Sequence, residues 1–200
     1  MRIAVYNFKG GMGKSPIAVN LALMTGAGIV TNELYVTYEK ALDAAQFIKV
    51  LPGAEIPKIP AAVPIIYDLG GYVDERVSHV LAECTHVVIP VSNEFQALQT
   101  TIYAVEEILK VTPRIVIVGT KLRGADFENI RHVLTGKLGD RIAGVPFFPL
   151  RHSTAFDHVM MRGLSLRDLV AEGGIQGHSF RNIAAEFDAL ANHLTKSTTP

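Results

Sequence analysis

The chain has 200 residues, 48% of them hydrophobic, and its 19 basic side chains are balanced by 19 acidic ones. This length and apolar content predict a single domain, residues 1–200, with a full core. Because the formal net charge is zero, a nucleic-acid or membrane partner would have to bind a local patch. The only cysteine, Cys84, excludes a disulfide framework and fits a cytoplasmic protein. No stretch approaches the roughly 18 apolar residues of a membrane span, and no signal peptide precedes the first apolar run.

Apolar runs and amphipathic periodicities alternate along the chain. The apolar runs predict strands at residues 3–6, 29–31, 63–67, 87–91, 114–118 and 142–148. The helical spacing predicts helices at residues 15–24, 38–50, 95–109, 127–138 and 180–194. A proline-rich connector, residues 52–64, is compatible with an edge strand. This alternation predicts an α/β fold, a doubly wound and mostly parallel sheet with helices on both faces and ligands at the carboxyl ends of its strands.

The segment between the first strand and the first helix reads Phe-Lys-Gly-Gly-Met-Gly-Lys-Ser at residues 8–15. Its glycines allow the backbone to curl, so that several N–H groups point at one anion. Lys14 would reach the β- and γ-phosphates of a nucleotide, and the Ser15 hydroxyl would bind Mg²⁺. The positive end of the following helix would face the same charge. The segment is therefore predicted to be the phosphate-binding loop of a P-loop NTPase.

In this loop, Phe8 stands where the usual pattern has its first glycine, and an additional lysine, Lys9, precedes the remaining glycines. The order Lys-Gly-Gly-x-Gly-Lys-Ser resembles the deviant Walker A box of the ParA/MinD family of ATPases. The resemblance implies that Lys9 crosses a dimer interface to the phosphates held by the partner subunit. Residues 88–98 and 145–166 are similar to two later segments of that family, so the resemblance covers almost the whole chain.

The resemblance is to the compact partition ATPases of plasmids and chromosomes. It implies that ATP binding and hydrolysis control dimerisation and DNA binding. ATP and Mg²⁺ would assemble a sandwich homodimer that binds DNA without sequence preference. A small centromere-binding, ParB-like protein would stimulate hydrolysis, which would be slow without it. The protein would accordingly be cytoplasmic and associated with the nucleoid.

Asp68 ends the apolar run at residues 63–67 and is followed by two glycines. Nucleotide hydrolases hold Mg²⁺ through a carboxylate at this place, usually by way of water. Gly71 can bring a backbone N–H to the γ-phosphate. The alternative is an aspartate that caps a helix or forms a turn. We assign Ser15 and Asp68 to the metal, and Lys9, Lys14 and Asp68 to catalysis.

Two departures from the family pattern affect the phosphates and the attacking water. Pro16 replaces a second Ser or Thr and so removes a hydroxyl and an N–H that could contact the α-phosphate, although proline is acceptable in a first helical turn. The second strand ends in Thr31, Asn32 and Glu33, where the family has aspartates. The residue that positions the water is therefore unassigned, with Glu33 and Asn32 as the candidates.

A third departure concerns the base. The strand at residues 114–118 leads into Thr120 and Lys121, where the family has asparagine and a basic residue. Thr120 can hydrogen-bond a base edge, and the stem of Lys121 can cover the face of the base. The candidate nucleotide-binding residues are Lys9, Gly10, Gly11, Met12, Gly13, Lys14, Ser15, Pro16, Thr120 and Lys121.

Residues 121–167 hold a local excess of basic side chains, which is the candidate DNA-binding patch. The basic residues are Lys121, Arg123, Arg131, Lys137, Arg141, Arg151, Arg162 and Arg167, against Asp126, Glu128, Asp140 and Asp157. Eight minus four gives a local charge of +4. The alternative is a set of ordinary solvated helix faces. The polar face of the C-terminal helix is not basic, which argues against the cationic membrane anchor of the MinD branch.

Two other functions remain open. A positioning ATPase for another cargo, such as a protein compartment or a conjugation apparatus, would use the same switch. A ligase resembling dethiobiotin synthetase would need a second substrate pocket with its own anchoring groups, and the sequence shows none. The seven histidines have no metal-ligand spacing and are assigned solvated or packing roles.

Overall fold

The computed structural model describes residues 1–33, 35, 38–71 and 74–196. Within these residues, seven strands form one sheet in the order β3-β2-β4-β1-β5-β6-β7, and every neighbouring pair is parallel. The strands are β1 (Arg2–Asn7), β2 (Gly28–Thr31), β3 (Phe47–Lys49), β4 (Ile65–Gly70), β5 (His86–Val91), β6 (Ile115–Leu122) and β7 (Phe147–Arg151). The order reverses on either side of β1, so the predicted doubly wound sheet is confirmed.

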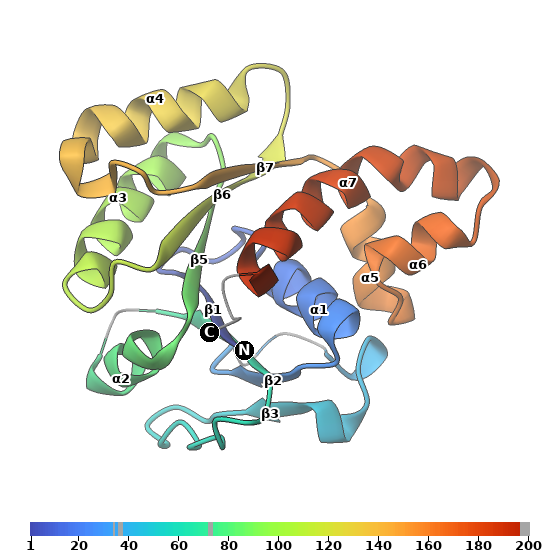
Figure 1. Cartoon of the computed structure of the whole chain (residues 1–200), viewed down its shortest axis with the longest axis horizontal. Helices are drawn as coiled ribbons and strands as arrows, with labels where there is room; N and C mark the ends of the chain where they lie inside the picture. The colour runs from blue at the N-terminus through green and yellow to red at the C-terminus, as the bar shows by residue number, and fades with distance from the viewer. Residues whose placement is uncertain (34, 36–37, 72–73, 197–200) are drawn as a thin grey trace.

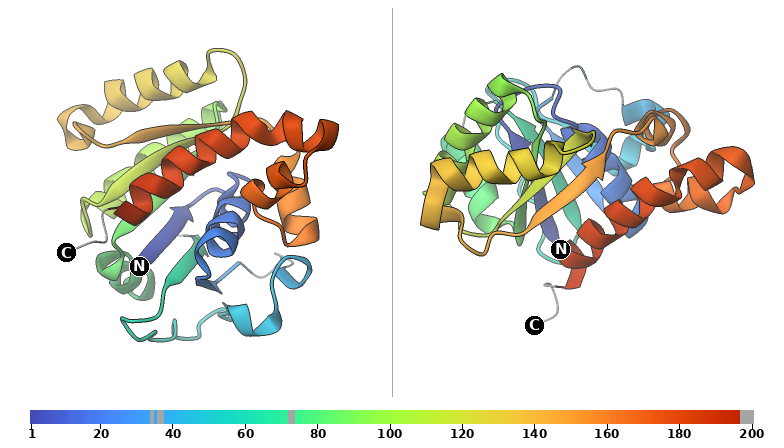
Figure 2. Two further views of the ribbon diagram at one scale, coloured as in Figure 1. Left: turned by 45° about the vertical axis from the view of Figure 1, so that its right-hand side comes forward. Right: turned by 90° about the horizontal axis from the view of Figure 1, so that it is seen from above.

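Helices cover both faces of this sheet (Figure 1). One face carries α2 (Glu75–Glu83), α3 (Phe95–Leu109) and α4 (Asp126–Leu138). The other carries α1 (Lys14–Thr25), α5 (Ala155–Arg162), α6 (Leu166–Ala171) and α7 (Gly174–Lys196). Figure 2 shows α7 running along β7, with α5 and α6 beside its amino-terminal half. No helix in the described part of the chain is both long and apolar enough to cross a membrane.

The two cores follow from the alternation of side chains along the strands. In β1, Ile3 and Val5 belong to the cluster under α1 and α7, whereas Ala4 and Tyr6 belong to the cluster under α2 and α3. All four side chains are fully buried. Since a central parallel strand is covered on both faces, its sequence must be apolar throughout. The continuous apolar runs in the sequence were therefore reliable indicators of the central strands.

The predicted helix at residues 38–50 is wrong. The structure has a short 3-10 helix, η1 (Tyr38–Lys40), a second one, η2 (Ala44–Gln46), and then the edge strand β3. Asp43 and Gln46 form a capping box at the start of η2, and the backbone becomes extended at Phe47, where β3 begins. Phe47, Ile48 and Lys49 pair with β2, whose edge would otherwise be unpaired. The alanine spacing is typical of a helix, but the pairing of residues 47–49 with β2 makes the end of this segment a strand.

Three further segments differ from the prediction. Residues 52–64 form no strand, and the edge of the sheet is β3 instead. The last strand begins at Phe147 rather than at 142, because Ile142 ends the 3-10 helix η3 (Gly139–Ile142). Helices α2, α5 and α6 were not among the predicted helices. They have nine, eight and six residues, so none shows a long period.

Candidate functional site

The loop between β1 and α1 is fastened at its start by Asn7, the last residue of β1. Its side-chain nitrogen donates to Pro90 O at 2.7 Å and to Thr101 Oγ1 at 2.9 Å, and its oxygen accepts from the Lys9 N–H at 3.2 Å. Gly11 and Gly13 have φ values of +76° and +84°, a region where a side chain would be strained. The glycines of the sequence motif therefore stand where the turn requires them.

The amino terminus of α1 is open to an anion. Gly13 occupies the N-cap position, no side chain caps it, and the first turn contains no acidic residue. The first N–H groups of a helix have no partner within the helix, and they carry its partial positive charge. Pro16 contributes no N–H to this turn, as the sequence implied. The arrangement is suited to phosphate groups.

Lys14, the second lysine of the loop, is almost fully buried, with 5% of its side chain exposed. Its ammonium lies 2.8 Å from Glu33 Oε1 and donates to Lys9 O at 3.3 Å. Glu33 can approach because residue 70 is glycine: a Cβ atom there would overlap the Glu33 carboxylate. The carboxylate after β2 is thus brought to the lysine of the loop.

Asn32, the other candidate for the attacking water, is already engaged. Its side-chain amide donates to Gly70 O at 2.9 Å and accepts from Gly70 N–H at 2.8 Å. The side chain therefore extends the pairing of β2 with β4 beyond the last residue of β2. Of the two candidates, only Glu33 contacts Lys14.

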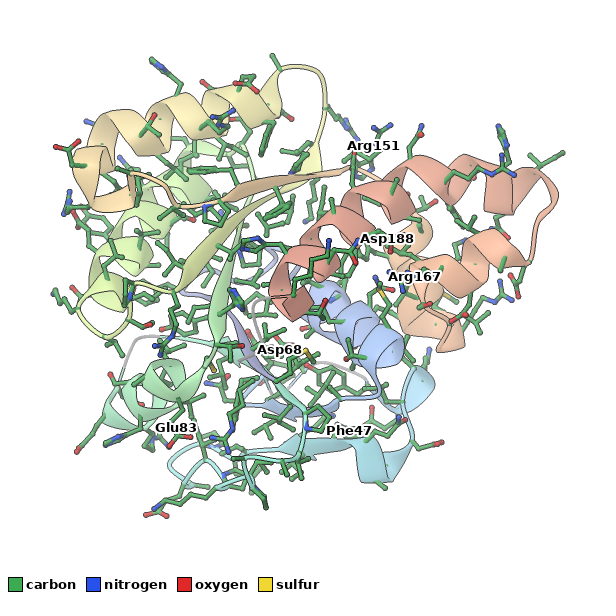
Figure 3. The ribbon with its side chains drawn as sticks, viewed as in Figure 1. Phe47, Asp68, Glu83, Arg151, Arg167 and Asp188 are labelled. Carbon is green, nitrogen blue, oxygen red and sulfur yellow. The ribbon has the colours of Figure 1, made fainter. Side chains whose placement is uncertain are left out.

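Asp68 lies in β4 between Val5 of β1 and Thr31 of β2 and is completely buried (Figure 3). Burial raises the pKa of its carboxyl, against the opposing effects of the Ser15 and Tyr38 hydroxyls and of the Lys14 ammonium. Tyr38 donates to Oδ2, whereas Oδ1 has no hydrogen-bond partner among the described residues. The alternative of a helix-capping aspartate does not apply to Asp68, because α2 is capped by Asp74, which accepts from Val77 N at 2.9 Å.

The residues around Asp68 fit a hydrated magnesium ion. The unpartnered Oδ1 is a buried acceptor of the hard oxygen type that Mg²⁺ prefers, and Ser15 supplies a hydroxyl close to the same carboxyl. No group of three or more His, Cys, Asp or Glu side chains in the described residues could hold a metal by itself. Mg²⁺ usually keeps several waters and takes further ligands from substrate phosphates, so one hydroxyl and one carboxylate are enough protein groups for it.

A cavity of about 180 Å³ opens beside the loop, between the first turn of α1 and the ends of β6 and β7. Gly13, Pro16 and Thr120 line it, together with His152, Ser153, Thr154, Phe156 and Asp157, none of which the sequence assigned to the nucleotide. Thr120 donates to Met12 O at 3.0 Å, and Lys121 Nζ donates to Gly11 O at 2.9 Å. Both base-reading candidates are thus tied to the loop backbone at one wall of this cavity. Residues 152–157 lie within the segment 145–166 that is similar to the family, but only the fold brings them to this cavity.

Lys9, the additional lysine of the loop, has a different acidic partner from Lys14. Its ammonium lies 3.4 Å from Glu94 Oε2 at the start of α3, and this pair is partly exposed. Lys9 lines a surface groove with a volume of about 540 Å³, together with Phe8, Gly71 and Tyr103. Lys9 therefore stands at the open surface of the site.

The basic residues of 121–167 do not form an uncompensated patch. Three of the arginines are paired with acids that lie outside the counted segment, on α7 or near its start. The pairs are Arg151 with Glu186 at 2.6 Å, Arg162 with Glu172 at 2.5 Å and Arg167 with Asp188 at 2.7 Å. Figure 3 shows Arg167 beside Asp188. Arg141 likewise pairs with Glu106 at 2.8 Å. Counting along the sequence could not find these partners, because the fold brings them from other elements.

The parallel sheet, its strand order and its glycine loop together define the fold of the P-loop NTPases. Solved structures with a similar fold were found by comparison. McdA from Cyanothece, as a variant in complex with ATP, has a TM-score of 0.65 at 10% identity, over 100% of this chain and 97% of that chain. The septum site-determining protein MinD from Pyrococcus horikoshii, with Mg-ADP, has a TM-score of 0.64 at 14% identity, over 98% and 96% of the two chains.

A ParA family ATPase from Chlorobium tepidum has a TM-score of 0.56 at 16% identity and covers 96% of this chain and 99% of its own. The structural neighbours are thus ParA/MinD family ATPases, and the predicted fold is confirmed. No protein-family model matches the sequence, and no curated protein matches it.

Proposed function

We propose that the protein is a ParA/MinD-type ATPase in which ATP and Mg²⁺ assemble a homodimer. The observation that carries the proposal is the convergence of the Lys14 ammonium, the Ser15 hydroxyl and the buried Asp68 carboxyl at the carboxyl ends of β1 and β4. These are the groups that hold the phosphates and the metal in nucleotide hydrolases. The neighbours solved with ATP or Mg-ADP support the same assignment.

The roles of the residues follow from their places. Loop N–H groups and Lys14 bind the β- and γ-phosphates, so Lys14 must exchange Glu33 for a phosphate oxygen. Ser15 and Asp68 would hold Mg²⁺, which neutralises charge on the phosphates when it is bound. Once Lys14 is on the phosphates, Glu33 is available to orient the attacking water and to accept its proton. The base enters the cavity beside Pro16 and Thr120.

Lys9 acts on a second subunit. Because Lys14 is the lysine at the phosphate cradle, the charge of Lys9 is best used on the nucleotide of a partner that docks over the groove beside Gly71. Lys9 must leave Glu94 to do so. Dimerisation then depends on the γ-phosphate, and hydrolysis reverses it.

Calorimetry tests the nucleotide site directly. Lys14→Ala should abolish ATP binding and leave the fold intact, because loops at strand ends carry little core energy. Lys49→Ala is the matched control, since Lys49 is also paired with a glutamate but lies at the sheet edge. Unchanged ATP affinity in Lys14→Ala would contradict the assignment.

The finer proposal is DNA partition: the ATP dimer binds DNA without sequence preference, and a ParB-like protein stimulates hydrolysis to release it. The arginine pairs weaken this proposal, since each guanidinium would have to exchange a carboxylate for a DNA phosphate. The same pairs favour the second candidate, a positioning ATPase for a cargo other than DNA. Both use the same nucleotide switch.

Filter binding of the ATP-loaded protein on unrelated duplexes separates the two. Partition predicts equal binding to every duplex, with an affinity that falls steeply with salt because counterions are released. Arg162→Glu should then weaken binding on all sequences, and Arg76→Glu, a paired arginine on α2, should not. Absence of binding at low salt would select the other cargo.

A further inference from the structure

Tyr38, the first residue of η1, is completely buried although its segment was predicted only as part of a helix. Its carbonyl oxygen accepts from Ala41 N at 2.8 Å and from Leu42 N at 2.9 Å, which fixes the turn. Its ring packs against Phe47 with the ring centroids 5.5 Å apart. Backbone and ring are thus both held, so the hydroxyl has a defined position.

That hydroxyl donates to Asp68 Oδ2. Side chains alternate along β4, and Ile66, two residues before Asp68, lies in the same core cluster as Tyr38 and the buried face of α1. Asp68 therefore projects to the face where the first turn of α1 begins. A tyrosine hydroxyl is protonated at neutral pH, so Tyr38 is the donor in this contact.

The two carboxylate oxygens of Asp68 differ in their hydrogen bonding. The bond from Tyr38 satisfies Oδ2, whereas Oδ1 has no partner among the described residues. The terminal torsion of an aspartate is broad, so an unrestrained carboxylate would sample several orientations. A buried acceptor without a partner is also costly, and a water of a hydrated metal would satisfy it.

We propose that Tyr38 is a positioning residue of the magnesium site, which holds Oδ2 of Asp68 so that Oδ1 is presented to the water shell of the metal. The inference rests on the proposed function, because it requires Mg²⁺ between Ser15 and Asp68. Partners that orient a metal-binding carboxylate act on metal affinity without touching the ion. A role in packing alone would require only the ring, which phenylalanine also supplies.

The test is the effect of Mg²⁺ on ADP affinity, measured by calorimetry with Mg²⁺ and with EDTA. Tyr38→Phe should reduce the gain in ADP affinity that Mg²⁺ gives by about tenfold, the usual loss when an outer partner is removed. ADP affinity in EDTA should be unchanged, which also shows that the variant is folded. Tyr67→Phe is the matched control, since Tyr67 is a buried tyrosine in β4 whose side chain lies in the opposite core cluster.

A double-mutant cycle shows whether Tyr38 acts through Asp68. In an Asp68→Ala background, Tyr38→Phe should cause no further loss of the Mg²⁺ effect. A further loss there, or an unchanged Mg²⁺ effect in Tyr38→Phe alone, would overturn the role of Tyr38. If Mg²⁺ had no effect on ADP affinity in the unmodified protein, the proposed magnesium site itself would fail.

Discussion

The ammonium of Lys14 lies 2.8 Å from a carboxylate oxygen of Glu33. A side chain of the protein itself thus contacts the lysine that we assign to the nucleotide phosphates. Because Lys14 is 5% exposed and Glu33 is 32% exposed, water screens this pair less than a surface pair. Under the proposed function, binding of a nucleotide would displace Glu33 from Lys14 and leave its carboxylate beside the phosphates.

Glu33→Gln should separate these two roles. Removal of the competing charge should tighten ATP binding by about tenfold, which corresponds to roughly 1.4 kcal/mol. Hydrolysis should slow by about 10²-fold, because an amide is a poor proton acceptor. Calorimetry and phosphate release measure the two effects. Glu39→Gln, which removes an exposed glutamate paired with Lys49, should change neither. Weaker ATP binding in Glu33→Gln would show that Glu33 does not compete with the phosphates.

The sequence predicted those parts of the site that depend on local backbone requirements. Gly11 and Gly13 are needed where φ is positive, and Asp68 follows an apolar run, although it lies within β4 rather than after it, so both left a pattern in the chain. Tyr38 left none, because its contact with Asp68 joins residues 30 positions apart. The acids that neutralise Arg151 and Arg167 were missed for the same reason. Motifs record backbone geometry, whereas these pairings exist only after folding.

Gly163, which ends α5, lies against the segment that carries Tyr38. Its φ is +64°, and a Cβ atom there would lie 2.8 Å from Ala41 O. Gly163→Ala should lower the free energy of unfolding by more than the roughly 1–2 kcal/mol that left-handed backbone costs a residue with a side chain. Gly53→Ala is the control, since Gly53 has φ +78° and nothing within 4 Å, and it should show the backbone cost alone. Urea unfolding that gives equal losses would contradict the close contact with Ala41.

His86, the first residue of β5, predicts how stability depends on pH. Burial lowers its pKa from the ordinary value of 6.5, and His193 and Arg114 add to this. Below pH 6.5 the imidazole is protonated in the unfolded chain but stays neutral in the folded chain. The free energy of unfolding therefore decreases as the pH is lowered from 6.5 to the lowered pKa of the folded protein. Unfolding curves from neutral to acidic pH should show this loss, and His86→Gln should reduce it. His79→Gln, at an exposed histidine, should leave the loss as it is.

The central claim is that the γ-phosphate converts a monomer to a dimer through Lys9, and light scattering measures this mass directly. The protein should have the mass of one chain without nucleotide and with Mg-ADP, and of two chains with Mg-ATP. Lys9→Ala should remain one chain in all three conditions, although it still binds ATP, because Lys9 pairs with Glu94 rather than lying in the phosphate cradle. The same mass in all conditions for the unmodified protein, or an ATP dimer of Lys9→Ala, would contradict the account.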